Sequence, residues 1–144
     1  MRNTTCVAAL IAASIGLVGP AAAQDEESYF ADLVGASEVP GPGDANGTGI
    51  ATLEWHAENE QFCYVLAVEN IGTATAAHVH RGIAGEAGPP VLTLDAPGAD
   101  GGSDGCIDAT AALRREIREN PAGFYFNVHN ADHPAGAIRG QLER

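Results

Sequence analysis

The alternation of apolar and polar positions predicts β-strands along most of this chain. Within residues 49–55, Ala51, Leu53 and Trp55 alternate with the polar Thr52 and Glu54. A period of two residues is typical of a strand with one buried face. We therefore expect this segment to place its apolar side chains in a core and its polar side chains on the surface.

The run at residues 62–68 is apolar on both faces, which predicts a central strand. One face carries Phe62, Tyr64, Leu66 and Val68, and the other carries Cys63, Val65 and Ala67. Further strands are predicted at residues 29–34, 75–80, 90–94, 123–130 and 135–142. Between them lie stretches rich in glycine and proline, which include a turn-rich stretch at 35–49 and a glycine-rich loop at 98–105.

Residues 108–120 interrupt this pattern and predict one short helix. Leu113 and Ile117 are four positions apart, an Asp or Thr can cap the start, and Pro121 ends the segment. Seven or so short antiparallel strands with one inserted helix predict an all-β fold, a β-sandwich in which each of two sheets buries one face.

The first 23 residues have the layout of a secretory signal peptide. Arg2 precedes an apolar run from Val7 to Val18, and the small residues Ala21 and Ala23 suit cleavage before Gln24. The alternative is a membrane anchor, but this run is shorter than the roughly 20 residues that a spanning helix needs. We expect an exported protein, periplasmic or secreted, with residues 24–28 as an acidic leader and one domain at 29–144.

Export changes how the cysteines are interpreted. Cys6 leaves with the signal peptide, so only Cys63 and Cys106 remain. In an oxidising compartment a pair of this kind is most simply a disulfide, the alternative being two buried thiols.

The mature chain is strongly acidic, which excludes some partners. Without Arg2 it has 6 arginines, no lysine and 19 carboxylates, so its net charge is 6 − 19 = −13. Such a chain repels nucleic acid and anionic membranes. We expect neither as a partner, and no insertion into a membrane.

Three of the five histidines form a pattern typical of a metal site. His78 and His80 flank Val79 in a predicted strand, so both imidazoles leave the same face. His129 shares the non-core face of another strand with Tyr125 and Asn127. If the two strands are close in space, three neutral imidazoles suit copper or zinc, and copper(II) binds more tightly in the usual divalent series.

The alternative is that these histidines are solvent-facing or hydrogen-bonded structural residues. His133, four positions after His129, could be a fourth ligand or a turn residue, and His56 is expected at the surface. No serine lies in a nucleophile elbow and no glycine-rich stretch has the features of a phosphate loop. We therefore predict no catalytic residue.

Four segments together resemble the chordin-type CHRD domain, a module of extracellular and bacterial exported proteins. They are residues 33–40 (LVGASEVP), 77–82 (AHVHRG), 125–129 (YFNVH) and 134–142 (PAGAIRGQL). The resemblance implies an extracellular β-sandwich and no generally accepted reaction. It gives weight to His78, His80 and His129, and to Arg139, for which we expect a role behind the site or, more simply, in a salt bridge.

A fainter likeness is to copper-zinc superoxide dismutase, a Greek-key sandwich that holds copper partly through a His-x-His strand. The chain has no histidine between His80 and His129, so the bridging ligand and the zinc site of that enzyme have no counterpart here. Taken together, these resemblances predict an antiparallel Greek-key sandwich of the immunoglobulin or superoxide dismutase type. The leading hypothesis is a copper-binding module with Tyr125, Asn127 and Arg139 around the ligands; the alternatives are a metal-independent interaction module and a dismutase-like copper enzyme.

Overall fold

A computed structural model describes residues 27–144, which contain eight β-strands and one α-helix. The predicted signal peptide and residues 24–26 of the leader lie outside the described residues. The strands are β1 (Glu27–Val34), β2 (Thr48–His56), β3 (Gln61–Glu69), β4 (Ala74–Arg81), β5 (Pro90–Leu94), β6 (Gly102–Asp108), β7 (Phe124–Asn130) and β8 (Ile138–Gln141). The helices are α1 (Ala111–Glu119) and two short 3-10 helices, η1 (Gly35–Ser37) and η2 (Pro121–Gly123).

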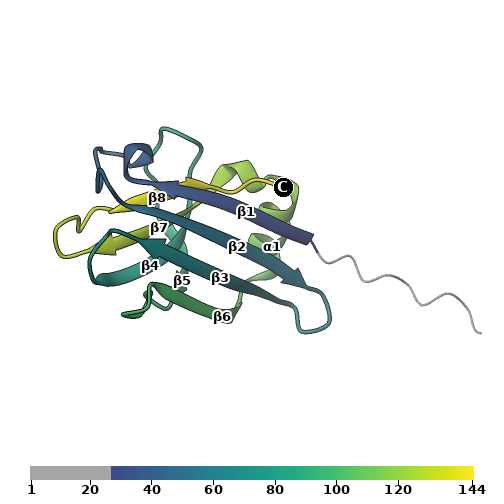
Figure 1. Cartoon of the computed structure of the whole chain (residues 1–144). Helices are drawn as coiled ribbons and strands as arrows, with labels where there is room; N and C mark the ends of the chain where they lie inside the picture. The colour runs from purple at the N-terminus through teal and green to yellow at the C-terminus, as the bar shows by residue number, and fades with distance from the viewer. Residues whose placement is uncertain (1–26) are drawn as a thin grey trace, which may run out of the picture.

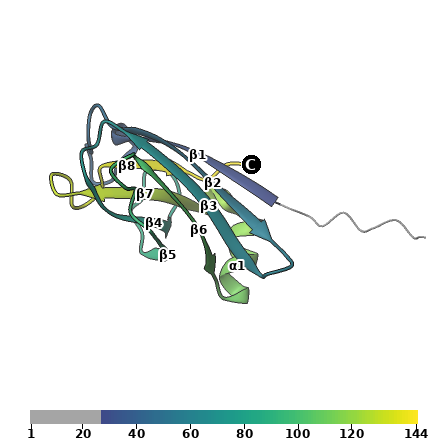
Figure 2. The same cartoon turned by 60° about the horizontal axis from the view of Figure 1, so that its bottom comes forward.

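The strands form one antiparallel sheet that curls into a nearly closed barrel or sandwich (Figures 1 and 2). The order is β5-β4-β7-β8-β1-β2-β3-β6, and the two edge strands, β5 and β6, approach each other. Three successive strands, β4, β5 and β6, are followed by β7, which returns beside β4. This order is that of a Greek key. The strands are antiparallel and are accompanied by one short α-helix, so the predicted all-β fold is confirmed.

The core lies inside the curled sheet and follows the predicted alternation. The side chains of Ala51, Leu53 and Trp55 on β2 are buried. The same holds for the predicted core faces of β3 (Phe62, Tyr64, Leu66 and Val68) and β7 (Phe124, Phe126 and Val128). The other apolar face of β3 is not buried in the core. Its residue Val65 is 56% exposed.

Strand β6 was not predicted, because it lies mostly within the glycine-rich stretch. Its residues alternate between exposed and half-buried and none is fully buried, so the sequence carries no apolar period. The strand is held instead by pairing with β3, in which Cys63 lies opposite Cys106. These two cysteines form a disulfide, as predicted.

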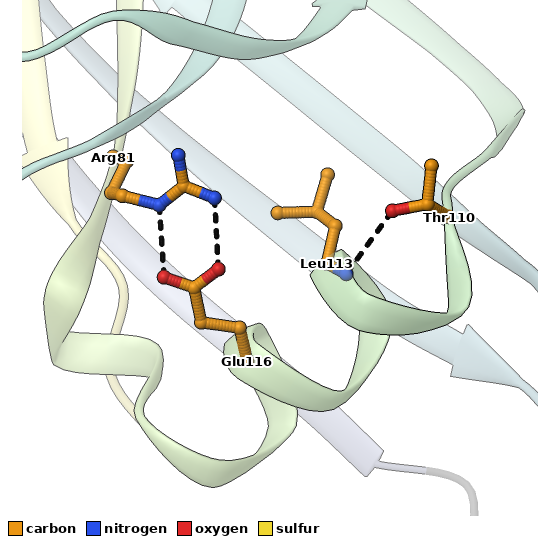
Figure 3. Close-up of polar contacts among 4 residues, drawn as sticks. All are labelled: Arg81, Thr110, Leu113 and Glu116. Atoms are coloured by element: carbon orange, nitrogen blue, oxygen red, sulfur yellow. Dashed lines mark hydrogen bonds and ion pairs between the residues drawn. The ribbon is translucent and has the colours of Figure 1, made fainter.

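Helix α1 begins and ends close to the predicted limits. The Thr110 hydroxyl caps its start by accepting a hydrogen bond from the Leu113 N–H at 3.2 Å (Figure 3). Glu116 receives two hydrogen bonds of 2.8 Å from Arg81 at the end of β4 (Figure 3). Ile117 is the buried residue of the helix, and Arg114 lies over the ring of Trp55, so α1 packs against the end of β2.

Residues 27–144 contain no helix with the length and hydropathy needed to cross a bilayer. Strand β1 begins at Glu27, two residues before the start predicted for the first strand.

Candidate metal centre

Antiparallel pairing of β4 with β7 brings the predicted histidines together. His78 lies opposite Asn127 and His80 opposite Tyr125, while His129 lies opposite Ala76. All three imidazoles project from the side of the sheet that faces away from the barrel core. One ring nitrogen of each lies within 4.8 Å of the ring nitrogens offered by the other two.

The spacing of two of these nitrogens fits a shared ion. His78 Nδ1 and His129 Nε2 are 3.2 Å apart. Two ligands at about 2.0 Å from a tetrahedral metal are separated by about 3.3 Å. The third ring, that of His80, is centred 5.4 Å from the His78 ring and 6.1 Å from the His129 ring.

Backbone carbonyls fix the tautomers of two of the rings. His80 Nδ1 donates to the carbonyl of Gly88 at 2.8 Å, and His129 Nδ1 donates to the carbonyl of Pro134 at 3.1 Å. In a neutral imidazole the other nitrogen, Nε2, then carries the free lone pair. His80 Nε2 is buried and has no hydrogen-bond partner among the described residues. A buried acceptor without a partner, on a ring beside two further imidazoles, is what a metal ligand requires.

The surroundings keep all three imidazoles neutral. Burial is the largest cause that lowers the pKa of His78, His80 and His129 below the ordinary value. The neighbouring imidazole of His129 lowers the pKa of both other histidines further. Because metal ions bind the neutral form, the group is prepared for coordination near pH 7.

Tyr125 and Arg139 support His80 from the neighbouring strands. The Tyr125 ring stacks on the His80 ring, with centroids 5.0 Å apart and planes inclined by 15°. The Tyr125 hydroxyl accepts a hydrogen bond of 3.1 Å from the Gly88 N–H, the residue whose carbonyl holds His80. On β8, the other neighbour of β7, Arg139 lies over the Tyr125 ring at 3.4 Å.

The guanidinium of Arg139 also forms hydrogen bonds with the β4–β5 loop. It is buried, and it donates to the carbonyls of Ile83 and Glu86 at 2.9 and 2.8 Å. We expected a salt bridge as its simplest role; among the described residues its hydrogen bonds go to these carbonyls and to Gln141, not to a carboxylate.

The hydrogen bonds of Asn127 go to a buried carboxylate, that of Glu38, and not to the histidines. This carboxylate was not identified from the sequence. Asn127 Nδ2 donates to both oxygens of Glu38, at 3.0 and 2.9 Å. Burial raises the pKa of Glu38 to about 7, while Asn127 and the positive charge of Arg139 act to lower it. Gly136 is required here, since a Cβ at this position would lie 2.3 Å from the Glu38 carboxylate.

This face of the sheet is more buried than we expected. Tyr125 and Asn127 were predicted on an exposed face, but both are 3% exposed and the three histidines are half-buried. The reason is that two loops cover the face. The turn after β1 brings in Glu38, and the loop at 82–89 is held by His80, Tyr125 and Arg139.

The remaining histidines lie apart from this group. The His133 N–H donates to Asn130 Oδ1 in the turn after β7, and its ring is not among the three that converge. His133 thus lies in the turn after β7, outside the group of three. His56 lies at the end of β2 beside Glu54, as expected for a surface position.

Comparison with known proteins identifies one family. The family model of the CHRD domain matches residues 29–142, which is nearly all of the described chain. No curated protein and no solved structure matches the chain.

Proposed function

The chain belongs to the CHRD domain family, and from this membership and the histidine group we propose that it is an exported metal-binding module. Its site takes one copper ion, with zinc as the second candidate, through His78, His80 and His129. The observation that carries the proposal is the convergence of three neutral imidazoles whose ring nitrogens lie within 4.8 Å of one another.

The donor set favours copper(II) over zinc. The site offers three nitrogens and no thiolate, and imidazole ligands hold copper(II) more tightly than zinc in the divalent series. The two cysteines of the mature domain are joined to each other and do not compete for the ion. This disulfide is compatible with an oxidising compartment, where the predicted signal peptide would deliver the chain.

Three protein ligands leave at least one coordination position open. An ion held in this way can be exchanged with other ligands, in contrast to a closed structural site with four protein ligands. We infer a role in copper handling or buffering outside the cytoplasm. Neither the site nor the family supplies a reaction, so the proposal includes no catalysis.

Calorimetric titration of the mature protein, from Gln24 onward, tests this proposal. We expect one copper(II) ion per chain in the wild type and loss of tight binding in His80→Ala. His56→Ala is the matched control, because it also removes an imidazole from a strand of the acidic surface. Equal binding by the wild type and His80→Ala would overturn the assignment.

The second candidate function, a metal-independent interaction module, is favoured by a separate observation. Large apolar side chains are exposed on β1, β2 and β3, which carry none of the three grouped histidines. That surface can serve a partner whether or not the histidines hold an ion.

A further inference from the structure

Exposed apolar side chains are concentrated on one face of the barrel, outside β1, β2 and β3. Five large hydrophobic residues are exposed among residues 27–144, and four of them lie on this face: Phe30 (54%), Val34 (39%), Ile50 (64%) and Val65 (56%). The fifth, Ile83, lies in the loop over the histidine group. The four residues on the strands are called the apolar face below.

The strand register makes these side chains neighbours. Phe30 pairs with Thr52, and Thr52 pairs with Val65 on the next strand. Ile50 points the same way two residues before Thr52, so it is the diagonal neighbour of both Phe30 and Val65. Diagonal pairs lie about 7–8 Å apart, within reach of large side chains. The residues therefore form a continuous surface across three strands.

The fold does not account for this surface. The opposite sides of the same strands already supply the core, through residues such as Tyr29, Leu53 and Leu66. Single exposed Val or Ile residues on strands are ordinary, but a contiguous group marks an interaction site. Beside Ile50 the surface is hollowed by about 270 Å³, with Thr48, Gly49, Ala67 and Glu69 around the hollow.

The charges around the apolar face have one sign. Glu54, Glu69 and Asp104 have outward side chains at the margin of the face, on β2, β3 and β6. Asp32 lies within the face, opposite Ile50 and between Phe30 and Val34 on β1. No arginine lies on these four strands, and the chain has no lysine. The six arginines of the described residues are elsewhere: Arg81, Arg114, Arg115, Arg118 and Arg144 around α1, and Arg139 under the histidine group.

We propose that the apolar face and its carboxylate rim form a docking surface for a protein segment that carries apolar side chains flanked by lysine or arginine. The apolar centre supplies area to bury, and the carboxylates select a basic partner. A second copy of this chain does not fit, because face-to-face packing would place the carboxylate rims against each other, which is costly. The surface lies on strands other than those that carry the histidines, so the inference is independent of metal binding.

The test uses the mature protein and a short synthetic peptide of alternating leucine and lysine. We follow the amide signals of the ¹⁵N-labelled protein by NMR as the peptide is added, and we repeat the titration with glutamate in place of lysine. We expect the lysine peptide to shift the signals of β1, β2 and β3, and the glutamate peptide to leave them unchanged. Shifts spread evenly over the acidic surface, or no shifts, would overturn the proposal.

Two variants separate docking from simple charge attraction. Ile50→Ser combined with Val65→Ser removes apolar area and keeps every charge, and we expect it to weaken peptide binding at least tenfold. Ile83→Ser is the matched control, since it removes an isoleucine that is 53% exposed from another surface, and we expect unchanged binding. Equal binding by all three proteins would contradict the proposal.

A third variant tests the carboxylates at the margin of the apolar face. Sedimentation tests whether a second copy of the chain binds there instead. Glu69→Gln combined with Asp104→Asn retains the apolar face, and we expect weaker binding with a smaller dependence on salt. A wild-type dimer that the Ile50→Ser, Val65→Ser variant abolishes would show that the face binds a second copy, and would overturn the proposed basic partner.

Discussion

His78 Nδ1 and His129 Nε2 lie 3.2 Å apart, although the two residues are separated by 51 positions in the chain. His129 Nδ1 donates its proton to Pro134, so in the neutral, metal-free pair the proton between the rings belongs to His78. That proton occupies the direction in which a shared ion would lie. Coordination of a shared ion by His78 Nδ1 would require His78 to carry its proton on Nε2, which would also free the lone pair of His129 Nε2. His80 Nε2 already has no hydrogen-bond partner among the described residues.

The burial of the three imidazoles predicts how they respond to pH. Because the pKa of each is lowered in the folded protein, the unfolded chain binds more protons between the folded pKa values and about 6.5. Their contribution to stability is then complete above pH 6.5 and is lost as the pH falls through the folded pKa values. We expect NMR titration of the metal-free protein to give midpoints below 6.5 for His78, His80 and His129, and we expect copper affinity to decrease over the same range. Midpoints above 6.5 would contradict the effect of burial.

The stack of Tyr125 on His80 predicts that the ring of Tyr125 matters more than its hydroxyl. Tyr125→Phe keeps the stacked ring and loses only the two hydrogen bonds with Gly88, whereas Tyr125→Leu loses the ring and the hydrogen bonds. A residue that orients a ligand in this way typically changes metal affinity by about 10- to 100-fold when it is removed. We expect a decrease of about tenfold or more for Tyr125→Leu and a smaller one for Tyr125→Phe. Calorimetry checks both, and equal affinities for wild type and Tyr125→Leu would rule out the positioning role.

Strands with a clear apolar period were predictable from the sequence, and the edge strand β6 was not. Leu53 and Leu66 follow a period of two and are buried as expected. Strand β6 has only polar and small residues around Asp104, and it exists because it pairs with β3 and is joined to it by a disulfide. That information is non-local, and no window along the sequence contains it.

The histidine site was also predictable from the sequence only in part. The spacing of His78 and His80 on one strand, and the face of His129 on another, predicted the three histidines that the structure brings together. Glu38 could not be identified in this way, since a glutamate in a turn rich in glycine and proline is normally exposed. It is buried because the turn folds over β7 and Asn127 provides its hydrogen bonds.

Glu38 predicts a pH dependence opposite in sign to that of the histidines. Its pKa is raised from 4.5 to about 7 by burial. The folded protein then binds more protons than the unfolded chain between these values, so the stability decreases as the pH rises from about 5 to 7. Glu38→Gln keeps a hydrogen-bond acceptor for Asn127 and removes the titration. We expect the variant to gain about 2 kcal/mol relative to wild type between pH 5 and 7.

Urea unfolding at a series of pH values checks this difference. The histidines make the same contribution to the pH dependence of the wild type and of Glu38→Gln. The difference between the two free energies of unfolding at each pH therefore reports on Glu38 alone. Asn127→Leu is the companion variant, because it removes the donor and leaves the carboxylate buried. We expect it to destabilise the protein by about 1–3 kcal/mol at pH 7 and less at pH 5, where Glu38 is protonated. A stability difference between Glu38→Gln and wild type that does not change with pH would show that Glu38 does not titrate in this range.

The disulfide predicts a separation between stability and metal binding. Cys63 and Cys106 join β3 to β6 across a loop with a sequence separation of 43, and such a crosslink stabilises a fold by about 4 kcal/mol in the chain-entropy model. We expect Cys63→Ala combined with Cys106→Ala to lose stability of this order in urea unfolding. The histidines lie on β4 and β7, which do not pair with β3 or β6, so the folded variant should bind copper as the wild type does. If copper binding is lost while the variant remains folded, the two halves of the sheet are coupled, and the site depends on more than the strands that carry it.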